Sequence, residues 1–234
     1  MNDVKELVRK VLIKDGARIK LLGDSITHGV GGTGFMQNGE HIINEFSRNP
    51  DGYCWAKQFK EYMQKEKGVE VINNACTGTR IEFVRDNFDT LVDDEDDLVI
   101  CTIGTNNRHI YHYEGKRPPR EEMWERVYTA LSGLIERFWQ SGKNYILVAN
   151  IPASKINERD GADFYRVLHM DDINAIYKEA REKYGFAFIS MYDLFMNYCD
   201  GNMDKVASYL GDGLHPNDKG YDVMFELIKD SLGV

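Results

Sequence analysis

Residues 18–25 read Arg-Ile-Lys-Leu-Leu-Gly-Asp-Ser. The run from Arg18 to Leu22 has the length and apolar content of a short buried strand, and Gly23 lets the chain turn sharply after it. Ser25 therefore falls at the mouth of a strand, where a following helix would point its free backbone N–H groups at a bound group. The stretch predicts a strand, a tight turn and a helix start, with a serine presented at the edge of a sheet.

Four more apolar runs predict strands, and helical patterns separate them. The runs are nearly continuous in apolar character, as expected for strands that are covered on both faces. The five predicted strands are Ile19–Leu22, Val69–Ile72, Leu98–Ile103, Tyr145–Ala149 and Phe186–Ile189. The predicted helices are Met1–Asp15, Tyr53–Lys67, Thr79–Asn87, Glu121–Gln140, Met170–Tyr184 and Lys219–Leu232. This alternation indicates an α/β fold in which a parallel sheet lies between two layers of helices.

The composition predicts a globular protein with one sizeable core, since 42% of the 234 residues are hydrophobic and 29% are charged. We find no internal repeat and no low-complexity linker, so residues 1–234 are expected to form a single domain. The net charge of −9 argues against nucleic acid or an anionic membrane as the main partner. No stretch approaches the length of a membrane span.

The compartment is predicted from the N-terminus and the cysteines. The segment Met1–Asp15 alternates charges with apolar residues and lacks the uninterrupted apolar core of a signal peptide. The four cysteines form no Cys-x-x-Cys pair, which fits free thiols in a reducing compartment. We therefore expect a cytoplasmic protein, unless a leader has been removed.

Three long polar segments break the alternation, and each leaves the carboxyl end of a predicted strand. They are residues 29–52, 107–120 and 152–168. In open parallel sheets this edge binds ligands, and loops of such length are often functional. The acidic run Asp93–Asp97 lies before the third strand instead, and we expect it to be a solvated turn and not a metal site.

Ser25, His215 and Asp212 together have the residue types that acyl transfer needs. A serine that attacks a carbonyl needs a base to accept its proton, and the base needs an acceptor that fixes its tautomer. Asp212 stands three residues before His215, a spacing at which one side chain can orient the other. Taken singly, the three are better explained as a helix cap, a loop histidine and an Asp-Gly turn. Because they fall at sheet edges that can converge, their combination predicts a catalytic triad.

Two further blocks offer donors for the negative charge that develops on the carbonyl oxygen during acyl transfer. Residues 73–78 read Asn-Asn-Ala-Cys-Thr-Gly and follow the second strand, and residues 103–107 read Ile-Gly-Thr-Asn-Asn and follow the third. We expect an oxyanion hole made of the backbone N–H groups of Ser25 and Gly78 and the side-chain amide of Asn106.

These four blocks, in this order, resemble the SGNH (GDSL) hydrolase family of serine esterases and acylhydrolases, over nearly the whole chain from Gly23 to Pro216. The family's blocks match Gly23-Asp24-Ser25, Gly78, Gly104-Thr105-Asn106 and Asp212-Gly213-Leu214-His215. Many members have aspartate where this chain has Asn107. The resemblance implies a three-layer α/β/α sandwich with a central parallel sheet of about five strands, flavodoxin-like in type. The strained Gly-x-Ser-x-Gly turn of the α/β-hydrolases is absent around Ser25.

The resemblance and the polar loops together imply a serine esterase that acts on short-chain acyl esters, first of all acetyl esters on a carbohydrate. The reaction would pass through an acyl-enzyme and need no metal or organic cofactor. Substrate contacts are expected from Asp24, His28, Asn107 and His109. We expect no metal site, because His109 and His112 lack a third ligand at a useful spacing.

Three alternatives to this function stay open. A lysophospholipase or thioesterase would show an apolar groove. An O-acetyltransferase would use the same triad and favour a sugar over water as the acceptor. A catalytically silent carbohydrate-binding module is the alternative that is not an enzyme. The expected partner is a small-molecule or carbohydrate ester, and the sequence leaves the oligomeric state open, including a homo-oligomer.

Overall fold

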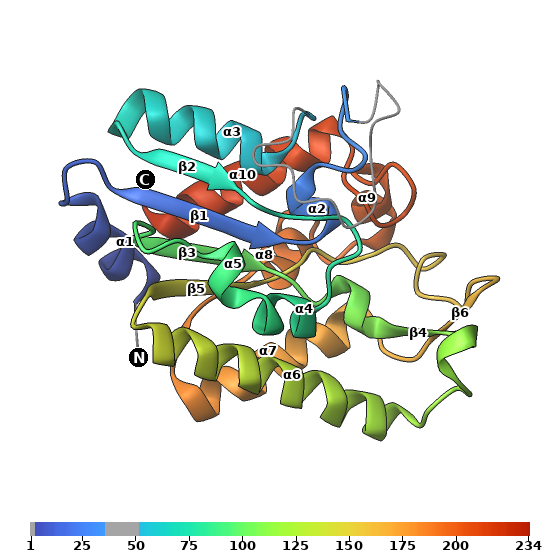
Figure 1. Cartoon of the computed structure of the whole chain (residues 1–234). Helices are drawn as coiled ribbons and strands as arrows, with labels where there is room; N and C mark the ends of the chain where they lie inside the picture. Colours follow the sequence, from blue (N-terminus) through green and yellow to red (C-terminus); the bar gives the residue numbers. More distant parts are fainter. Residues whose placement is uncertain (1–2, 36–51) are drawn as a thin grey trace.

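The five predicted strands form one parallel sheet, in the order β2-β1-β3-β5-β7, in a computed structural model that describes residues 3–35 and 52–234 (Figure 1). The strands are β1 (Arg18–Gly23), β2 (Glu70–Asn73), β3 (Leu98–Thr102), β5 (Asn144–Ala149) and β7 (Ala187–Ser190). Each strand begins and ends within one residue of its prediction. The predicted α/β class with a central parallel sheet is therefore confirmed.

Parallel pairing brings the carboxyl ends of these strands to one edge of the sheet. Leu21 pairs with Asn73 of β2, and Gly23 pairs with Thr102 of β3, so the chain leaves three neighbouring strands at nearly the same level. Because β1 lies between β2 and β3, the turn that follows β1 is flanked by a loop on each side. Ser25 therefore lies within this edge and not at its margin.

Alternate residues along the strands point into two apolar cores, one on each face of the sheet. Ile19 and Leu21 of β1 belong to the first core, and Leu22 belongs to the second. The first core lies under α1 (Val4–Leu12), α3 (Trp55–Tyr62), α8 (Met191–Tyr198), α9 (Met203–Ser208) and α10 (Asp218–Leu232). The second core lies under α4 (Ile81–Asp86), α5 (Phe88–Leu91), α6 (Arg120–Ser141) and α7 (Met170–Tyr184). The sheet and its two helix layers form the expected three-layer sandwich (Figure 1).

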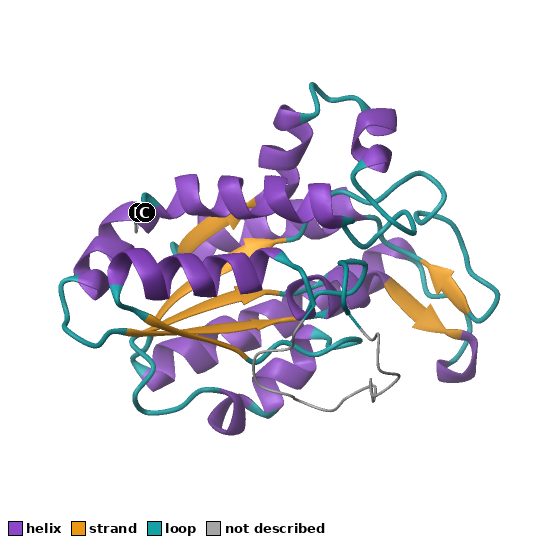
Figure 2. Ribbon diagram, turned by 90° about the horizontal axis from the view of Figure 1, so that it is seen from above, coloured by secondary structure: helices purple, strands orange, loops and turns teal. Residues whose placement is uncertain are grey.

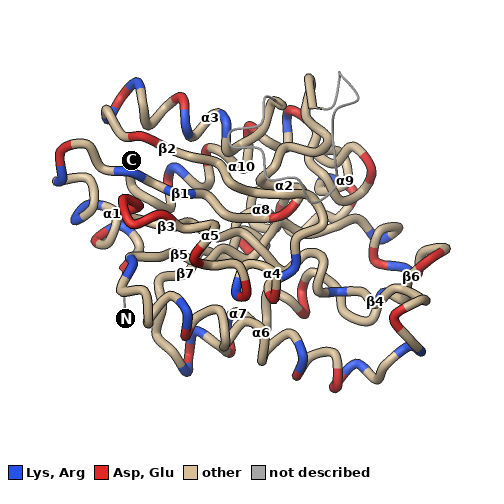
Figure 3. Tube along the Cα trace, in the orientation of Figure 1, with Lys and Arg blue, Asp and Glu red and all other residues tan. Residues whose placement is uncertain are grey.

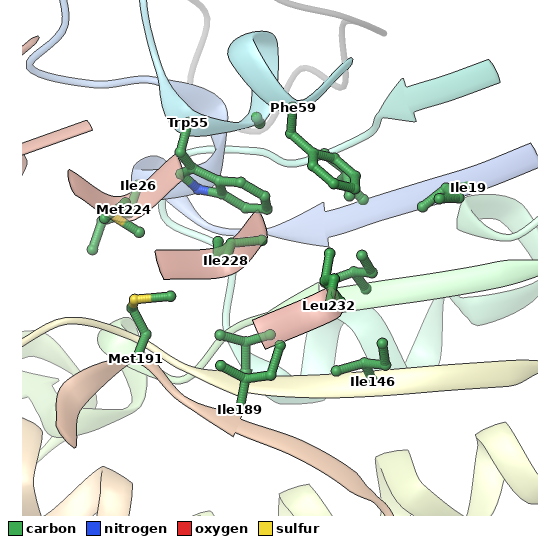
Figure 4. Close-up of a cluster of buried hydrophobic side chains, with 14 of the residues drawn as sticks. Ile19, Ile26, Trp55, Phe59, Ile146, Ile189, Met191, Met224, Ile228 and Leu232 are labelled. Atoms are coloured by element: carbon green, nitrogen blue, oxygen red, sulfur yellow. The ribbon is translucent and has the colours of Figure 1, made fainter. Parts of the chain in front are cut away.

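The first core joins α3 and α10 to the sheet (Figure 4). Trp55 and Phe59 of α3 are fully buried, and their spacing of four residues puts both on the same face of the helix. The two rings belong to the same core as Ile228 and Leu232 of α10, and Figure 4 shows these four side chains near β1. Burial of a phenylalanine side chain contributes about 1.5–3 kcal/mol, so these contacts fix α10 firmly against the sheet.

The predicted helices are present, with differences at their ends. α7 agrees with its prediction at both ends, and the predicted helix at 53–67 forms α3 and then widens into a π turn (η1, Met63–Lys67). Gly68, with φ of +66°, ends that turn. The expected helix start after Gly23 is the single turn α2 (Ser25–His28). The pattern does not predict α5, α8 and α9, which are only four, eight and six residues long and show too little periodicity.

Two of the predicted polar segments pair with each other. Residues 107–120 contain β4 (His109–Tyr111), and residues 152–168 contain β6 (Phe164–Arg166). The two strands form a separate antiparallel ribbon, which Figure 2 shows beyond the carboxyl ends of the main sheet. Most of the third polar segment, residues 36–51, lies outside the described residues.

The helices and the cysteines bear on two predictions from the sequence, namely that no segment spans a membrane and that the thiols are free. Within residues 3–35 and 52–234, no helix is long and apolar enough to cross a membrane. All four cysteines are buried free thiols, as expected. The compartment itself stays a prediction.

The acidic run Asp93–Asp97 forms the predicted turn before β3, but it is only partly solvated: Asp94 and Glu95 are exposed, and Asp96 is buried. It folds against the amino ends of β1 and β3 (Figure 3), where it meets Arg18 and Lys20. Nζ of Lys20, whose side chain is fully buried, lies 2.8 Å from Oδ2 of Asp93 and 3.4 Å from Oδ2 of Asp96. Nε of Arg18 lies 3.0 Å from Oδ1 of Asp96, and burial raises the pKa of that aspartate. Lys20 occupies an inward-facing position of β1, so its charge is tolerated only because these carboxylates neutralise it.

Lys20→Ala should lower the free energy of unfolding by about 3 kcal/mol, because it leaves two carboxylates with one cation fewer in a dry site. Lys14→Ala is the matched control, since it removes an exposed lysine that pairs with Asp97 at 2.6 Å, and it should cost at most about 1 kcal/mol. Urea titrations of the two variants and the wild type measure both losses. Equal losses in the two variants would contradict the special role of the buried pair.

Candidate active site

Ser25, His215 and Asp212 form one hydrogen-bonded chain at the carboxyl edge of the sheet. Oγ of Ser25 lies 2.8 Å from Nε2 of His215, and Nδ1 of His215 lies 2.7 Å from Oδ2 of Asp212. Ser25 is the first residue of α2 and is only 4% exposed. The other two residues come from the loop between α9 and α10, so the fold joins positions 190 residues apart.

Asp212 orients the histidine through its side chain and its backbone. Oδ1 of Asp212 accepts hydrogen bonds from the backbone N–H groups of Leu214 at 2.9 Å and His215 at 2.8 Å. Partial burial opposes ionisation, but the hydrogen bonds from the side chain and backbone of His215 hold the pKa of Asp212 well below its ordinary value. An ionised Asp212 accepts a hydrogen bond from the N–H group at Nδ1 of the His215 ring. This tautomer leaves Nε2 free to accept a proton from Ser25.

Two glycines let neighbouring backbone approach the loop that carries His215. Gly31 has φ of +93°, and a Cβ there would lie 2.5 Å from the carbonyl oxygen of Pro216 and 3.0 Å from Cβ of His215. Gly213 has φ of +86°, and its carbonyl accepts a hydrogen bond of 2.8 Å from the backbone N–H of Ser154. A Cβ at Gly213 would lie 2.3 Å from Oγ of Ser154. A side chain at Gly31 would therefore push this loop away from the end of α2, and a side chain at Gly213 would push it away from the turn after β5.

Asp24, one of the expected substrate contacts, lies in the turn between β1 and α2. Its side chain is fully buried. Oδ1 caps α2 by accepting from the backbone N–H of Ile26 at 3.1 Å, and Oδ2 accepts from Nδ2 of Asn150 at 3.0 Å. The same Nδ2 donates to Oγ1 of Thr105 at 2.7 Å. Burial raises the pKa of Asp24, and hydrogen bonds from Thr105 and Ile26 oppose that rise. Asp24 thus joins the loops that follow β1, β3 and β5, and the expected contact of Asp24 with a substrate stays a prediction.

Three other expected substrate contacts, His28, Asn107 and His109, are at most 7% exposed. Nδ1 of His28 lies 2.9 Å from Oγ1 of Thr77, and Oδ1 of Asn107 accepts the first backbone N–H of α4 at 3.0 Å. Nδ1 of His109 lies 3.1 Å from Nη1 of Arg166, and burial together with that positive charge lowers the pKa of His109 to about 3. In this structure these side chains hold the loops around Ser25 together. Since Ser25 itself is only 4% exposed, their low exposure does not decide the matter, and contact of these side chains with a substrate stays a prediction. No group of three His, Cys, Asp or Glu side chains in the described ranges could hold a metal ion.

Gly78 and Asn106 lie in the two loops that flank Ser25. Gly78, with φ of +82°, stands between β2 and α4. Asn106 is half-buried in the 3₁₀ turn η2 (Thr105–Arg108), and its Nδ2 donates to the carbonyl of Thr79 at 2.9 Å. An amide nitrogen carries two hydrogens, so one is left for another acceptor. The N–H of Ser25 belongs to the first turn of a helix and has no partner within it. The donors expected for an oxyanion hole therefore come from adjacent loops, and their role stays a prediction.

Asn150 also belongs to this site, although none of the four sequence blocks contains it. It directly follows β5, is 1% exposed, and contacts Asp24 and Thr105 as described above. A polar residue at the carboxyl end of an apolar strand is the signal that selects Asn106. The same signal, applied to the fourth predicted strand, would have selected Asn150.

Comparisons with known proteins show the family of the chain and its fold. The model of the GDSL-like lipase/acylhydrolase family matches residues 21–223. An acetylxylan esterase of Xylanibacter ruminicola is 26% identical over 243 residues, and the match covers 94% of this chain and 44% of that protein. The chain therefore spans less than half the length of this curated relative.

Two solved structures have a similar fold. Axe2, an acetylxylan esterase from Geobacillus stearothermophilus, is 19% identical with a TM-score of 0.66, and the match covers 95% of this chain and 96% of that one. LAE5, an α/β hydrolase enzyme from the metagenome of Lake Arreo in Spain, is 19% identical with a TM-score of 0.64, and the match covers 95% and 98%. At these identities the likeness shows the fold alone, and the family is shown by the match over residues 21–223. The chain belongs to the GDSL-like lipase/acylhydrolase family.

Proposed function

We propose that this chain is a serine esterase that hydrolyses short-chain acyl esters, first of all acetyl esters on a carbohydrate. The observation that carries the proposal is the hydrogen-bonded chain from Ser25 through His215 to Asp212. The curated relative and the Geobacillus structure are both acetylxylan esterases, which supports an acetyl group on a sugar polymer as the target.

The first half of the proposed reaction acylates Ser25. Nε2 of His215 accepts the hydroxyl proton while Oγ of Ser25 attacks the ester carbonyl carbon. The carbonyl electrons move onto oxygen, and the ionised Asp212 stabilises the imidazolium that forms. The tetrahedral intermediate then collapses, the ester C–O bond breaks, and His215 returns the proton to the leaving alcohol.

The second half of the proposed reaction frees the enzyme. Water attacks the acyl-serine, and His215 again accepts the proton. The second tetrahedral intermediate then collapses, the bond between the acyl carbon and Oγ of Ser25 breaks, and His215 returns its proton to Oγ as the carboxylic acid leaves. In both halves the N–H groups of Ser25 and Gly78 and the amide of Asn106 would donate to the oxyanion, and one such donor is worth about 2.7–4 kcal/mol.

The proposed specificity predicts that kcat/KM is highest for acetyl esters and falls as the acyl chain grows. The side chain that is hydrogen-bonded to Ser25 is that of His215, and Asn106 in the adjacent loop is also polar, so a long alkyl chain would gain little by leaving water there. Initial rates on p-nitrophenyl esters from acetate to octanoate measure this trend, and acetylated xylo-oligosaccharides test the alcohol portion.

A kcat/KM that rises steadily from acetate to octanoate would contradict the proposal and favour the lysophospholipase or thioesterase alternative. Transfer of acetyl groups to an added sugar in place of water would favour the O-acetyltransferase. A complete absence of ester turnover would favour the silent binding module.

Ser25→Ala should lower kcat by about 10⁶, because it removes the nucleophile of a group of residues that act as a unit. Its Tm should stay close to that of the wild type, since one buried hydroxyl is lost. Ser231→Ala is the matched control, because it also removes one serine hydroxyl. That hydroxyl donates to the carbonyl of Leu227 at 2.7 Å and has no part in the proposed reaction. A Ser25→Ala variant that keeps a tenth of the wild-type kcat would rule out Ser25 as the nucleophile.

Asp212→Asn should lower kcat by about 10⁴, because an amide cannot hold the ring in the same tautomer. The variant also has a signature in stability. The pKa of Asp212 is lowered in the folded chain, so the carboxylate stabilises the fold above its unfolded pKa of about 3.9, and this contribution is lost as the pH falls through the folded pKa.

The free energy of unfolding should therefore differ more between the wild type and Asp212→Asn at pH 6 than at pH 3. Urea titrations at both pH values measure the difference. A difference that is the same at the two pH values would show that ionisation of Asp212 does not stabilise the fold.

A further inference from the structure

A cavity lies at the carboxyl edge of the sheet, the edge that also carries Ser25, past the ends of β5 and β7. It is a cavity of about 290 Å³, close to the lower limit for ligand sites in proteins. Its walls come from the turn after β5, the start of α7, the start of α8 and the start of α9. The side chains that matter for its chemistry are those of Lys155, Glu158, Asp171, Tyr192 and Met203.

One wall of the cavity is held in place by a buried ion pair. Oε2 of Glu158 accepts a hydrogen bond of 2.8 Å from Nη1 of Arg108, whose side chain is fully buried. Oε1 of Glu158 accepts the backbone N–H of Met170, the first residue of α7, at 3.0 Å. Arg108 is the last residue of η2, the turn that also carries Asn106. The cavity wall is therefore built onto the same turn as the candidate oxyanion donor.

The cavity is also connected to the loop of Asp212 and His215. The turn after β5 donates a hydrogen bond of 2.8 Å from the backbone N–H of Ser154 to the carbonyl of Gly213. Along the sheet edge, β5 and β7 lie two and three strand spacings from β1, which is about 10–14 Å. A ligand whose ester reaches Ser25 must therefore extend well past one sugar ring to occupy this cavity.

The lining groups suit a neutral ligand that carries many hydroxyl groups. The phenol of Tyr192 is half-buried and has no hydrogen-bond partner among the described residues, and Lys155 has no ion-pair partner there. Burial, followed by the charges of Asp171 and Glu158, raises the pKa of Tyr192 to about 12, so its hydroxyl keeps its proton and can donate. One lysine and two carboxylates give both donors and acceptors. The ring of Tyr192 and the side chain of Met203 offer apolar contact to a sugar ring face.

We propose that this cavity is a subsite that binds a sugar unit of an oligosaccharide substrate, at a distance from the acetylated unit that lies at Ser25. This proposal rests on the proposed esterase function. It adds that the substrate is an oligosaccharide long enough to reach both Ser25 and the cavity. A long acyl chain fits the cavity less well, because Lys155, Glu158 and Asp171 would have to lose water without gaining hydrogen bonds.

The test compares three acetyl esters: p-nitrophenyl acetate, an acetylated xylose and acetylated xylotetraose. In the wild type, kcat/KM should be higher for the tetramer than for the monomer. Tyr192→Ala should lower kcat/KM for the tetramer by about tenfold, the loss expected for one good contact, and leave p-nitrophenyl acetate unchanged. Lys155→Ala changes an exposed side chain, so it carries no risk to folding. It should lower kcat/KM for acetylated xylotetraose several-fold.

Tyr198→Ala is the matched control, because Tyr198 belongs to the same helix, α8, and does not line the cavity. It should leave all three substrates unchanged. If the wild type hydrolyses the three esters without a preference for length, or if Tyr192→Ala and Lys155→Ala lower all three equally, the subsite is overturned and the esterase proposal stands.

If the wild type hydrolyses none of the three esters, the esterase proposal fails, and direct binding then decides on the subsite. Titration calorimetry with unacetylated xylotetraose should show weaker binding to Tyr192→Ala than to the wild type, with Tyr198→Ala unchanged. Equal affinity of all three proteins, or no binding to the wild type, would overturn the subsite on its own.

Discussion

The geometry of the candidate site depends on the buried hydrogen bonds of Asn150. A single amide nitrogen donates to the carboxylate of Asp24 and to the hydroxyl of Thr105, and so joins the loops that follow three neighbouring strands. A buried carboxylate is tolerated only when hydrogen bonds replace the water it has lost. The three loops therefore have one favourable arrangement. Ser25 and Asn106, which directly follow Asp24 and Thr105, take their positions from it.

The sheet and the long helices could be predicted from the sequence, because their signals are local. A continuous apolar run such as Leu98–Ile103 predicts a strand covered on both faces, whatever its partners are. The order of the motifs along the chain also placed Ser25, His215 and Asp212 near one another. The pairing of β4 with β6 could not be predicted, because it joins two polar segments that are remote in sequence and have no apolar pattern of their own.

The partners of several polar residues could not be predicted, because these partners lie far away in the sequence. Lys20 stands in an otherwise apolar strand, and only the fold shows that Asp93 and Asp96 neutralise it. Asp24 and His109 stand beside the motifs and have polar side chains, so they were expected to meet a substrate. In the structure both are buried and bonded to the chain itself, and their contact with a substrate stays a prediction.

The charged cluster around Lys20 and the candidate site lie at opposite ends of the same strand, β1. Lys20 lies three residues before Gly23, where β1 ends, which is roughly 10 Å along the strand, and Ser25 lies beyond that end in α2. Substitutions at such a distance usually have additive effects on stability. The two ends of the sheet can therefore change independently during evolution or in the laboratory. A reinforced amino edge would leave room for destabilising substitutions at the carboxyl edge, which is where a new specificity would have to arise.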